Sequence, residues 1–165
     1  MNVTDRLGAI GRERGDHAAV AACAEVATAF CELLDAGDAA AAFQLHAADL
    51  DFYPPGAQAA LSRDAAQTAA ERMLRAYPGR RTLHVIGNFL GQAVAADRVD
   101  AQYVVTVYEL TRPEGGGAVE REVPHLFALA HELAVFRREP DGAWRYASQR
   151  MIPIAPLRPF GEETP

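Results

Sequence analysis

Two side chains of this 165-residue chain supply a carboxylate and an imidazole, the groups that acid–base chemistry uses most often. Asp35 lies near the end of an apolar helical pattern, roughly 80° around the helix from the centre of its apolar stripe at Ala27. It is either a solvated carboxylate at a helix end or a carboxylate directed into the interior. His84 stands between Leu83 and Val85 in an apolar strand pattern. It is either a hydrogen-bonded core histidine or a group that exchanges protons near neutral pH.

Further aromatic and basic side chains are candidates for a ligand pocket. Tyr53 is either a hydrogen-bond donor in such a pocket or a packed core residue with its hydroxyl at the surface. His125 and His131 fall on one face of a strand but ~20 Å apart, too far to chelate one metal ion. We favour His131 as a second pocket histidine because apolar residues surround it; the alternative is a packed or exposed strand histidine. Five more residues are predicted to line the cavity or the core: Phe52, Met73, Tyr103, Tyr108 and Phe127.

Composition and charge exclude several classes of protein. A chain that is 50% hydrophobic and 23% charged can bury one sizeable core in one domain. A net charge of −6 without a basic stripe argues against nucleic acid and against anionic membrane surfaces as partners. No apolar run approaches the ~18 residues of a membrane span, and the N-terminus lacks a signal-peptide core, so we expect a cytoplasmic protein.

Cofactor and metal motifs are also missing from the sequence, so we expect neither group. No His or carboxylate set has metal-ligand spacing, and no glycine-rich phosphate loop or nucleophile elbow occurs. Cys23 and Cys31 would lie ~12 Å apart along one helix, which excludes a disulfide between them. We expect two reduced core thiols.

The chain divides into an N-terminal arm (1–15), a folded domain (16–152) and a proline-rich tail (153–165). Apolar spacing and capping residues predict three helices in the first half of the domain. The first is capped by Asp16 and stops at Gly37, the second runs from Asp38 through Leu45, and the third, capped by Ser62, runs from Arg63 to Tyr77.

After Gly79 the pattern changes to runs rich in Val, Tyr, Thr and Ile, which are typical of strands. We predict strands over 81–95, 98–111 and 144–152, and a short one at Phe52-Tyr53. Segment 124–138 is ambiguous: its Ala, Leu and Glu favour a helix, whereas the turn at 140–142 indicates a hairpin, so we favour a strand. Helices followed by antiparallel strands form an α+β layout, in which a curved sheet around a long helix encloses a conical cavity.

Three stretches, taken in order, resemble the SnoaL-like family of the NTF2-like superfamily. They are FCELLDAGDAAAAFQLHAADLDFYPPG at 30–56, RTLHVIGN at 81–88 and DGAWRYASQR at 141–150. The resemblance implies a cone-shaped α+β barrel, with N-terminal helices packed on a curved antiparallel sheet. The superfamily includes polyketide cyclases, scytalone dehydratase, ketosteroid isomerase, limonene-epoxide hydrolase, dioxygenase small subunits and non-catalytic binders, and the fold alone does not choose among them.

The resemblance also implies roles for three residues. Members similar to scytalone dehydratase carry a pocket Asp where this chain has Asp35, and a catalytic His where it has His84, so the resemblance implies an acid–base dyad of these two residues. A pocket Tyr follows at about the position of Tyr53. Ketosteroid isomerases place an Asp general base just before the equivalent proline; here Tyr53 precedes Pro54, which argues against that mechanism.

We therefore expect a cofactor-independent acid–base enzyme, a dehydratase, isomerase or cyclase, acting on a hydrophobic carbonyl compound such as a polyketide or steroid-like molecule. The alternative is a non-catalytic small-molecule binder, or a structural subunit resembling the small subunit of ring-hydroxylating dioxygenases. An epoxide hydrolase ranks third, because Asp97 and Asp100 do not form a convincing Asp–Arg–Asp set. We also expect a homodimer that covers an apolar sheet face, with Val105, Val107, Leu126 or Phe136 in the contact.

Overall fold

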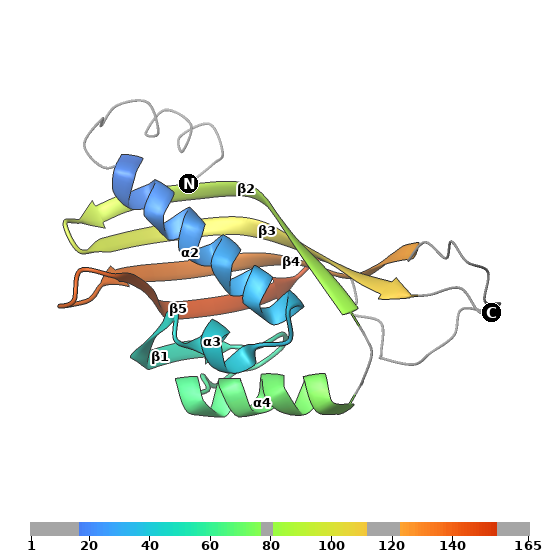
Figure 1. Ribbon diagram of the computed structural model, residues 1–165. Coiled ribbons are helices and arrows are strands. Elements are labelled where there is room, and N and C mark those ends of the chain that lie inside the picture. Colours follow the sequence, from blue (N-terminus) through green and yellow to red (C-terminus); the bar gives the residue numbers. More distant parts are fainter. Residues whose placement is uncertain (1–16, 77–80, 112–122, 155–165) are drawn as a thin grey trace.

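The computed structural model describes residues 17–76, 81–111 and 123–154, which form helices packed against one curved sheet (Figure 1). The helices are α2 (His17–Asp35), α3 (Ala39–Phe43) and α4 (Arg63–Ala76). The strands are β1 (His46–Tyr53), β2 (Arg81–Ala95), β3 (Arg98–Thr111), β4 (Val123–Arg138) and β5 (Trp144–Pro153). The α+β layout is confirmed; the predicted arm at 1–15 and the tail beyond 154 lie outside the described residues.

Capping residues set where two of the helices begin. The Asp38 carboxylate accepts a hydrogen bond from the backbone N–H of Ala41 at 2.9 Å, and the Ser62 hydroxyl accepts one from the N–H of Ala65 at 3.4 Å. Each bond satisfies a donor that the first helical turn leaves unpaired. After α2 the chain turns at Gly37, whose φ of +80° suits glycine.

The five strands form one sheet in the order β1-β5-β4-β3-β2. Strands β2 to β5 are antiparallel neighbours, as predicted, but β1 pairs with β5 in parallel. The prediction of an all-antiparallel sheet is therefore wrong for β1, which lies at one edge. The chain leaves β1 through α4 and enters the sheet again at the opposite edge, so the neighbour of β1 is the last strand and not the next one.

The ambiguous segment 124–138 lies in β4, at the interior of the sheet. β4 pairs with β3 on one side and with β5 on the other, so both sides of its backbone have hydrogen-bond partners. Sheet pairing on both sides outweighs the helix propensity of its Ala, Leu and Glu residues.

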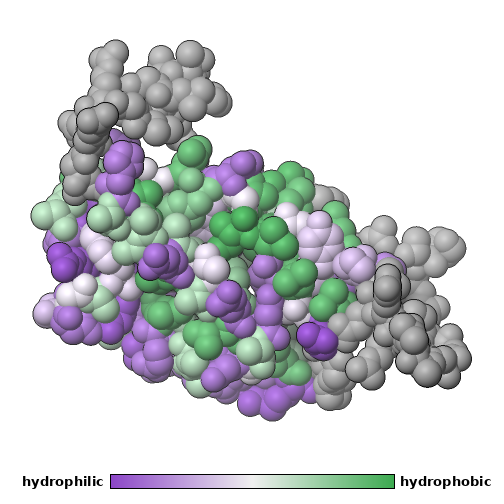
Figure 2. All heavy atoms as spheres, turned by 45° about the horizontal axis from the view of Figure 1, so that its top comes forward, coloured by the Kyte–Doolittle hydropathy of each residue, from purple (hydrophilic) through white to green (hydrophobic). Residues whose placement is uncertain are grey.

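The inner face of the sheet carries the core. On β3, alternate residues from Val99 to Val107 are buried, with the side chains between them more exposed. On the outer face several large apolar side chains stay 41–55% exposed: Leu83, Val85, Leu126, Leu133 and Ile152. Figure 2, in which the top of Figure 1 comes forward, views the side of α2 and the edge strand β2, where hydrophobic and hydrophilic side chains are interspersed. Of the four residues expected in a dimer contact, Val105, Val107 and Phe136 are buried in the core, and Leu126 alone is exposed.

Aromatic rings fill one end of the space between α2 and the sheet. The ring centroids of Phe136 and Tyr146 are 4.4 Å apart, and those of Phe30 and Phe43 are 5.7 Å apart. Tyr103, 2% exposed, joins this cluster through a hydrogen bond of 2.8 Å between its hydroxyl and that of Tyr146. The predicted conical interior is therefore packed core at this end.

Helix α2 lies on the inner face and contacts β2 along its length (Figure 1). Its buried face carries Cys23, Ala27, Phe30 and Cys31, and both cysteines are free thiols, as predicted. By length and composition alone α2 is also apolar enough to cross a membrane, contrary to the expectation that no such run exists. That test is also passed by core helices of globular domains, and here the buried residues of α2 pack on the sheet.

Gly91 of β2 lies at a close approach between the sheet and α2. A Cβ atom there would lie 2.7 Å from Cγ1 of Val20, whereas at Gly87 nothing lies within 4 Å. Val20 is β-branched and stiff, so it cannot turn aside cheaply.

We expect Gly91→Ala to lower the free energy of unfolding by about 1–3 kcal/mol, because the added methyl group pushes α2 away from β2. Gly87→Ala, on the same strand, is the matched control and should stay within about 0.5 kcal/mol of the parent protein. Urea unfolding of both variants measures the difference. Equal stabilities would show that α2 does not approach β2 at Gly91.

Candidate active site

Asp35, the last residue of α2, is bonded to two residues of β2. Its Oδ1 lies 2.5 Å from Nδ1 of His84 and accepts a hydrogen bond from the Thr82 hydroxyl at 2.9 Å. Its Oδ2 accepts the backbone N–H of His84 at 2.8 Å. The side chains of Asp35 and His84 are 17% and 18% exposed, so the pair is largely but not fully removed from solvent.

The two-residue period of a strand produces this arrangement. Thr82 and His84 are two residues apart, so β2 presents both side chains on its inner face. β2 is an edge strand, and the N–H of His84 has no sheet partner on that side, so a carboxylate can cap it. Helix α2 meets this edge of the sheet at its C-terminal end, where Asp35 lies. The structure therefore brings Asp35 and His84 into contact as a pair, as the resemblance implied.

The hydrogen bonds determine the charge and the tautomer of the pair. Burial by itself raises the pKa of the Asp35 carboxyl, but hydrogen bonds from the His84 side chain, the His84 backbone and Thr82 outweigh it, so the pKa is lowered. Because a carboxylate only accepts hydrogen bonds, Nδ1 of His84 carries a proton. In the neutral imidazole Nε2 then holds a lone pair, and it has no hydrogen-bond partner among the described residues.

Apolar side chains share the row of His84 on the inner face, whereas the next row, that of Thr82, is polar. His84 pairs with Val107, which pairs in turn with Ala128. A β-bulge at this point makes Phe127 the extra residue of β4, and it packs against the core beside Val107. Phe127 is thus near the pair, as a lining residue should be.

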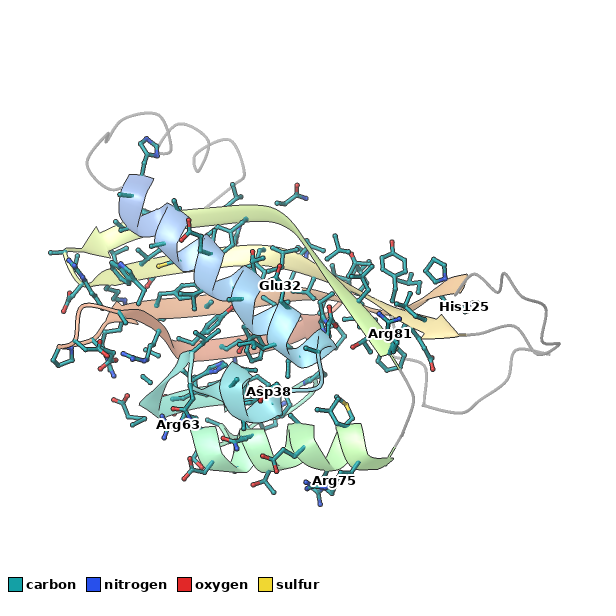
Figure 3. All side chains as sticks on the ribbon, in the orientation of Figure 1. Glu32, Asp38, Arg63, Arg75, Arg81 and His125 are labelled. Atoms are coloured by element: carbon teal, nitrogen blue, oxygen red, sulfur yellow. The ribbon has the colours of Figure 1, made fainter. Side chains whose placement is uncertain are left out.

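The same bulge reverses the choice between the two histidines of β4. Past the bulge, His125 pairs with Glu109, which pairs with Thr82, so His125 lies on the inner face at the end of the sheet near Arg81 (Figure 3). His131 is exposed on the outer face. The preference for His131 as a pocket histidine is therefore wrong, because the extra residue changes which face each side chain takes.

Tyr53 and Tyr108 also lie on the outer face, away from Asp35 and His84. The guanidinium carbon of Arg150 lies 3.7 Å from the centroid of the Tyr53 ring, and Arg150 pairs with the exposed Leu133. Tyr108 pairs with the exposed Leu83 and Leu126. The structure does not place either tyrosine beside the pair, because one step along a strand moves a side chain to the other face.

The remaining lining candidates divide between core and surface. Phe52 faces inward, with its ring centroid 6.2 Å from that of Phe43, and Tyr103 belongs to the buried aromatic cluster. Met73 is 46% exposed on α4 and lines no part of the inner face. The sequence pattern of α4 did not indicate which part of the sheet this helix would cover.

The structure also reveals a buried polar chain that the sequence analysis missed. His46, Glu132 and Gln149 are at most 3% exposed. Nε2 of His46 lies 2.9 Å from Oε1 of Gln149, and the Gln149 side chain also bonds the carboxyl of Glu132. The available signal was Glu132 itself, a charged residue at an inner position of β4 between small apolar ones.

A separate cleft of about 300 Å³ lies at the start of β1 and shares no residue with the Asp35–His84 pair. Its lining includes Gln44, Arg63, Glu139 and Arg145. Its arginines and its glutamate make it an unsuitable cavity for an apolar ligand. Within residues 17–76, 81–111 and 123–154, no three His, Cys, Asp or Glu side chains are grouped to hold a metal ion.

We expect His84→Ala to raise the pKa of the Asp35 carboxyl, because the substitution removes one of the hydrogen bonds that favour the charged form while burial continues to oppose it. Titration of the carboxyl carbon by ¹³C NMR measures the shift. His17→Gln, at the exposed start of α2, is the control and should leave the titration unchanged. A carboxyl that titrates alike in the parent and in His84→Ala would refute the pairing.

Comparison with known proteins identifies the family of the chain. The family model of the SnoaL-like domain matches residues 16–150. No protein with a curated description matches the chain in sequence.

Solved structures share the fold at low sequence identity. ActVI-ORFA from Streptomyces coelicolor is 16% identical, with a TM-score of 0.67 over 81% of this chain and 96% of that one. A protein from Catenulispora acidiphila in complex with S-DNPA is 19% identical, with a TM-score of 0.69 over 84% and 95%. A candidate dehydratase of the NTF2-like family from Streptomyces avermitilis is 18% identical, with a TM-score of 0.66 over 83% and 97%.

At these identities the structural neighbours establish the fold alone, and the family model establishes the family. It spans nearly all of the predicted domain, including α2 and the strands that carry Asp35 and His84. The chain therefore belongs to the SnoaL-like domain family and has the NTF2-like fold.

Proposed function

We propose that this protein is a cofactor-independent acid–base enzyme that acts on a hydrophobic carbonyl compound by dehydration, isomerisation or cyclisation. The observation that carries the proposal is the contact between the Asp35 carboxylate and Nδ1 of His84. It leaves the Nε2 lone pair of His84 as a base on an apolar inner face. An oriented imidazole of this kind is the most common general base in enzymes.

Asp35 acts here as a positioning residue. It accepts three hydrogen bonds from β2, so neither the carboxylate nor the imidazole can rotate freely. A base held in one orientation needs no reorganisation when the proton moves. The carboxylate also stabilises the imidazolium that forms after proton transfer.

In the dehydration of a β-hydroxy ketone, Nε2 of His84 takes the proton from the carbon between the carbonyl and the carbinol carbon. The electron pair of that C–H bond forms the enolate, and the carbonyl π pair moves to oxygen. The carbonyl then re-forms, the C–O bond to the hydroxyl breaks, and the leaving oxygen takes the proton back from His84 as water. The enzyme ends as it began, with no oxidant or metal consumed.

The comparisons support this class of reaction. One structural neighbour is a candidate dehydratase, and another was solved with a bound small molecule. Small-molecule binding on the inner face fits the apolar surroundings of His84, which include Val107 and Phe127.

We also propose that two copies of the chain associate through the outer face of the sheet. That face exposes Leu133 and Ile152 on the neighbouring strands β4 and β5, and Leu83 and Val85 on the edge strand β2, and exposed apolar side chains of this kind mark a contact surface. Sedimentation equilibrium should give twice the mass of one chain. Leu133→Arg should then yield single chains, and a parent protein that sediments as a single chain would exclude the dimer.

The activity is tested with 3-hydroxy-1-tetralone, whose loss of water gives 1-naphthol, measured by its fluorescence. We expect the parent protein to accelerate this reaction, and Asp35→Asn or His84→Gln to reduce kcat at least ~100-fold, because general-base catalysis is lost.

Asp51→Asn and His17→Gln change exposed residues of the same types and should keep the parent rate. Deuterium exchange next to the carbonyl of 1-tetralone gives a second readout of proton removal. If Asp35→Asn catalyses both reactions as well as the parent, the pair is not catalytic and the protein is a binder.

A further inference from the structure

A row of polar side chains crosses the inner face of the sheet next to the Asp35–His84 pair. Thr82 of β2 pairs with Glu109 of β3, and Glu109 pairs with His125 of β4. Directly opposed residues of neighbouring strands stand on the same face of a sheet. Since the Thr82 hydroxyl bonds Asp35 of α2, the helix that lies on the inner face, Glu109 and His125 also stand on that face. We call Thr82, Glu109 and His125 the polar row.

The polar row lies on the accessible side of His84. Its residues are partly buried on β2 and β3, and the row ends at His125, which is exposed. Figure 3 shows His125 and Arg81 at this end of the sheet. On the other side of His84, the inner residues Val105 and Ala130 are buried in the core. A ligand that touches His84 therefore lies on the side of the polar row and not on the side of the core.

Glu109 is a direct neighbour of His84 on the inner face. His84 pairs with Val107, and Glu109 follows Val107 by two residues on the same strand. Diagonal neighbours of this kind have Cα atoms about 7–8 Å apart, within reach of long side chains. His125 lies one strand further, which places its Cα roughly 12 Å from that of His84. One ligand can therefore contact His84 and Glu109 without passing through the core.

The polar row supplies both acceptors and donors of hydrogen bonds. Carboxylate oxygens only accept, and their roughly four lone-pair sites let Glu109 take a bond from a ligand besides its contacts within the protein. An imidazole N–H of His125 can donate. A hydroxyl group both donates and accepts, so it complements Glu109 and His125 together. An apolar group at the same place would displace water from these side chains without replacing its hydrogen bonds, which costs free energy.

The spacing of the two rows sets where such a hydroxyl group lies in the ligand. Thr82 and His84 are two residues apart, so the polar row is ~7 Å along the strands from the row of His84. His84 acts on the carbon beside the carbonyl group in the proposed reaction. A hydroxyl group on the far ring of a fused two-ring ketone lies at about this distance from that carbon, so one molecule can contact both rows.

We infer that Glu109 and His125 are specificity-determining residues, which hold a hydroxyl group on the part of the substrate remote from the reacting carbon. The inference rests on the proposed function. Glu109 accepts the hydrogen bond of that hydroxyl group and His125 donates one to its oxygen, while His84 acts on the carbon beside the carbonyl group. No covalent bond forms or breaks at the polar row, so its effect is on the choice and the orientation of the substrate.

Three substrates that differ at one position test the inference with the full-length protein: 3-hydroxy-1-tetralone, its 6-hydroxy derivative and its 6-methoxy derivative. The methoxy group can accept a hydrogen bond but cannot donate one. The parent protein should convert the 6-hydroxy compound with a kcat/KM at least ~10-fold higher than that of the 6-methoxy compound, because only the hydroxyl group donates to Glu109. Equal kcat/KM values for these two compounds would overturn the inference.

Variants of the polar row show which side chain causes the preference. Glu109→Leu removes the acceptor and should lower kcat/KM for the 6-hydroxy compound at least ~10-fold, while the value for 3-hydroxy-1-tetralone stays within about twofold and so shows that the variant is folded. Glu109→Gln keeps the shape and a weaker acceptor and should fall between the two, and His125→Ala should reduce the preference about threefold. Tyr108→Phe removes a hydroxyl group from the outer face of β3 and should leave the preference unchanged. A preference that survives in Glu109→Leu, or an equal loss for all three substrates in both variants of Glu109, overturns the inference.

A second readout does not depend on turnover. Naphthalene-1,6-diol and 6-methoxy-1-naphthol are the dehydration products of the two substituted substrates, and fluorescence titration measures their affinities for the protein. The parent should bind the diol at least ~10-fold more tightly than the methoxy compound, and Glu109→Leu should bind both about equally. If the parent binds the two products equally while Asp35→Asn has lost turnover, the inference fails and the proposed function stands. If Asp35→Asn turns over like the parent, the proposed function fails, and a preference for the diol that depends on Glu109 then supports recognition of the hydroxyl group by a binding protein.

Discussion

The carboxylate of Asp35 joins the end of α2 to the edge of the sheet, and the candidate site depends on this junction. It accepts the backbone N–H of His84, the imidazole Nδ1 and the Thr82 hydroxyl. A helix end and an edge strand both leave backbone groups without partners, so each benefits from a polar side chain at the point of contact. The bonds that hold α2 on β2 are therefore the same bonds that orient the imidazole of His84. Local stability and the proposed acid–base role are coupled at this position.

The interior offers two kinds of environment to carboxyl groups, and the fold separates them. Near the end of α2 the chain supplies hydrogen-bond donors, which favour a charged Asp35. Deeper along β4, the aromatic cluster and the absence of a cationic partner favour a neutral Glu132. Core residues, Val105 and Ala130 among them, lie between the two. One inner face therefore favours a charged carboxylate at one place and a neutral carboxyl group at another.

The two faces of the sheet decide which candidate residues can act together. Alternation along β3 buries Val105 and Val107 and leaves Tyr108 on the outer face. One extra residue in β4, Phe127, then brings His125 to the inner face and leaves His131 outside. A bulge of this kind leaves no reliable mark in a single sequence, because Phe and Leu at 126–127 fit either register. The spacing of residues along the sequence therefore did not show which side chains share the inner face with Asp35 and His84.

The sequence by itself determined most of the elements and singled out Asp35 and His84. Capping at Asp38 and Ser62, the β-branched runs after Gly79 and the hairpin turn at 140–142 are local signals, and their elements formed where expected, apart from an early end of the second helix at Phe43 and an earlier start of β1 at His46. Asp35 and His84 were recognisable because residue type and resemblance coincided. Only the tertiary structure decided that β1 lies parallel to β5, that Tyr53 faces away from the pair, and that Glu132 is buried beside Gln149. Those outcomes depend on strand order and register, which arise from contacts between distant segments and are not encoded in any local pattern.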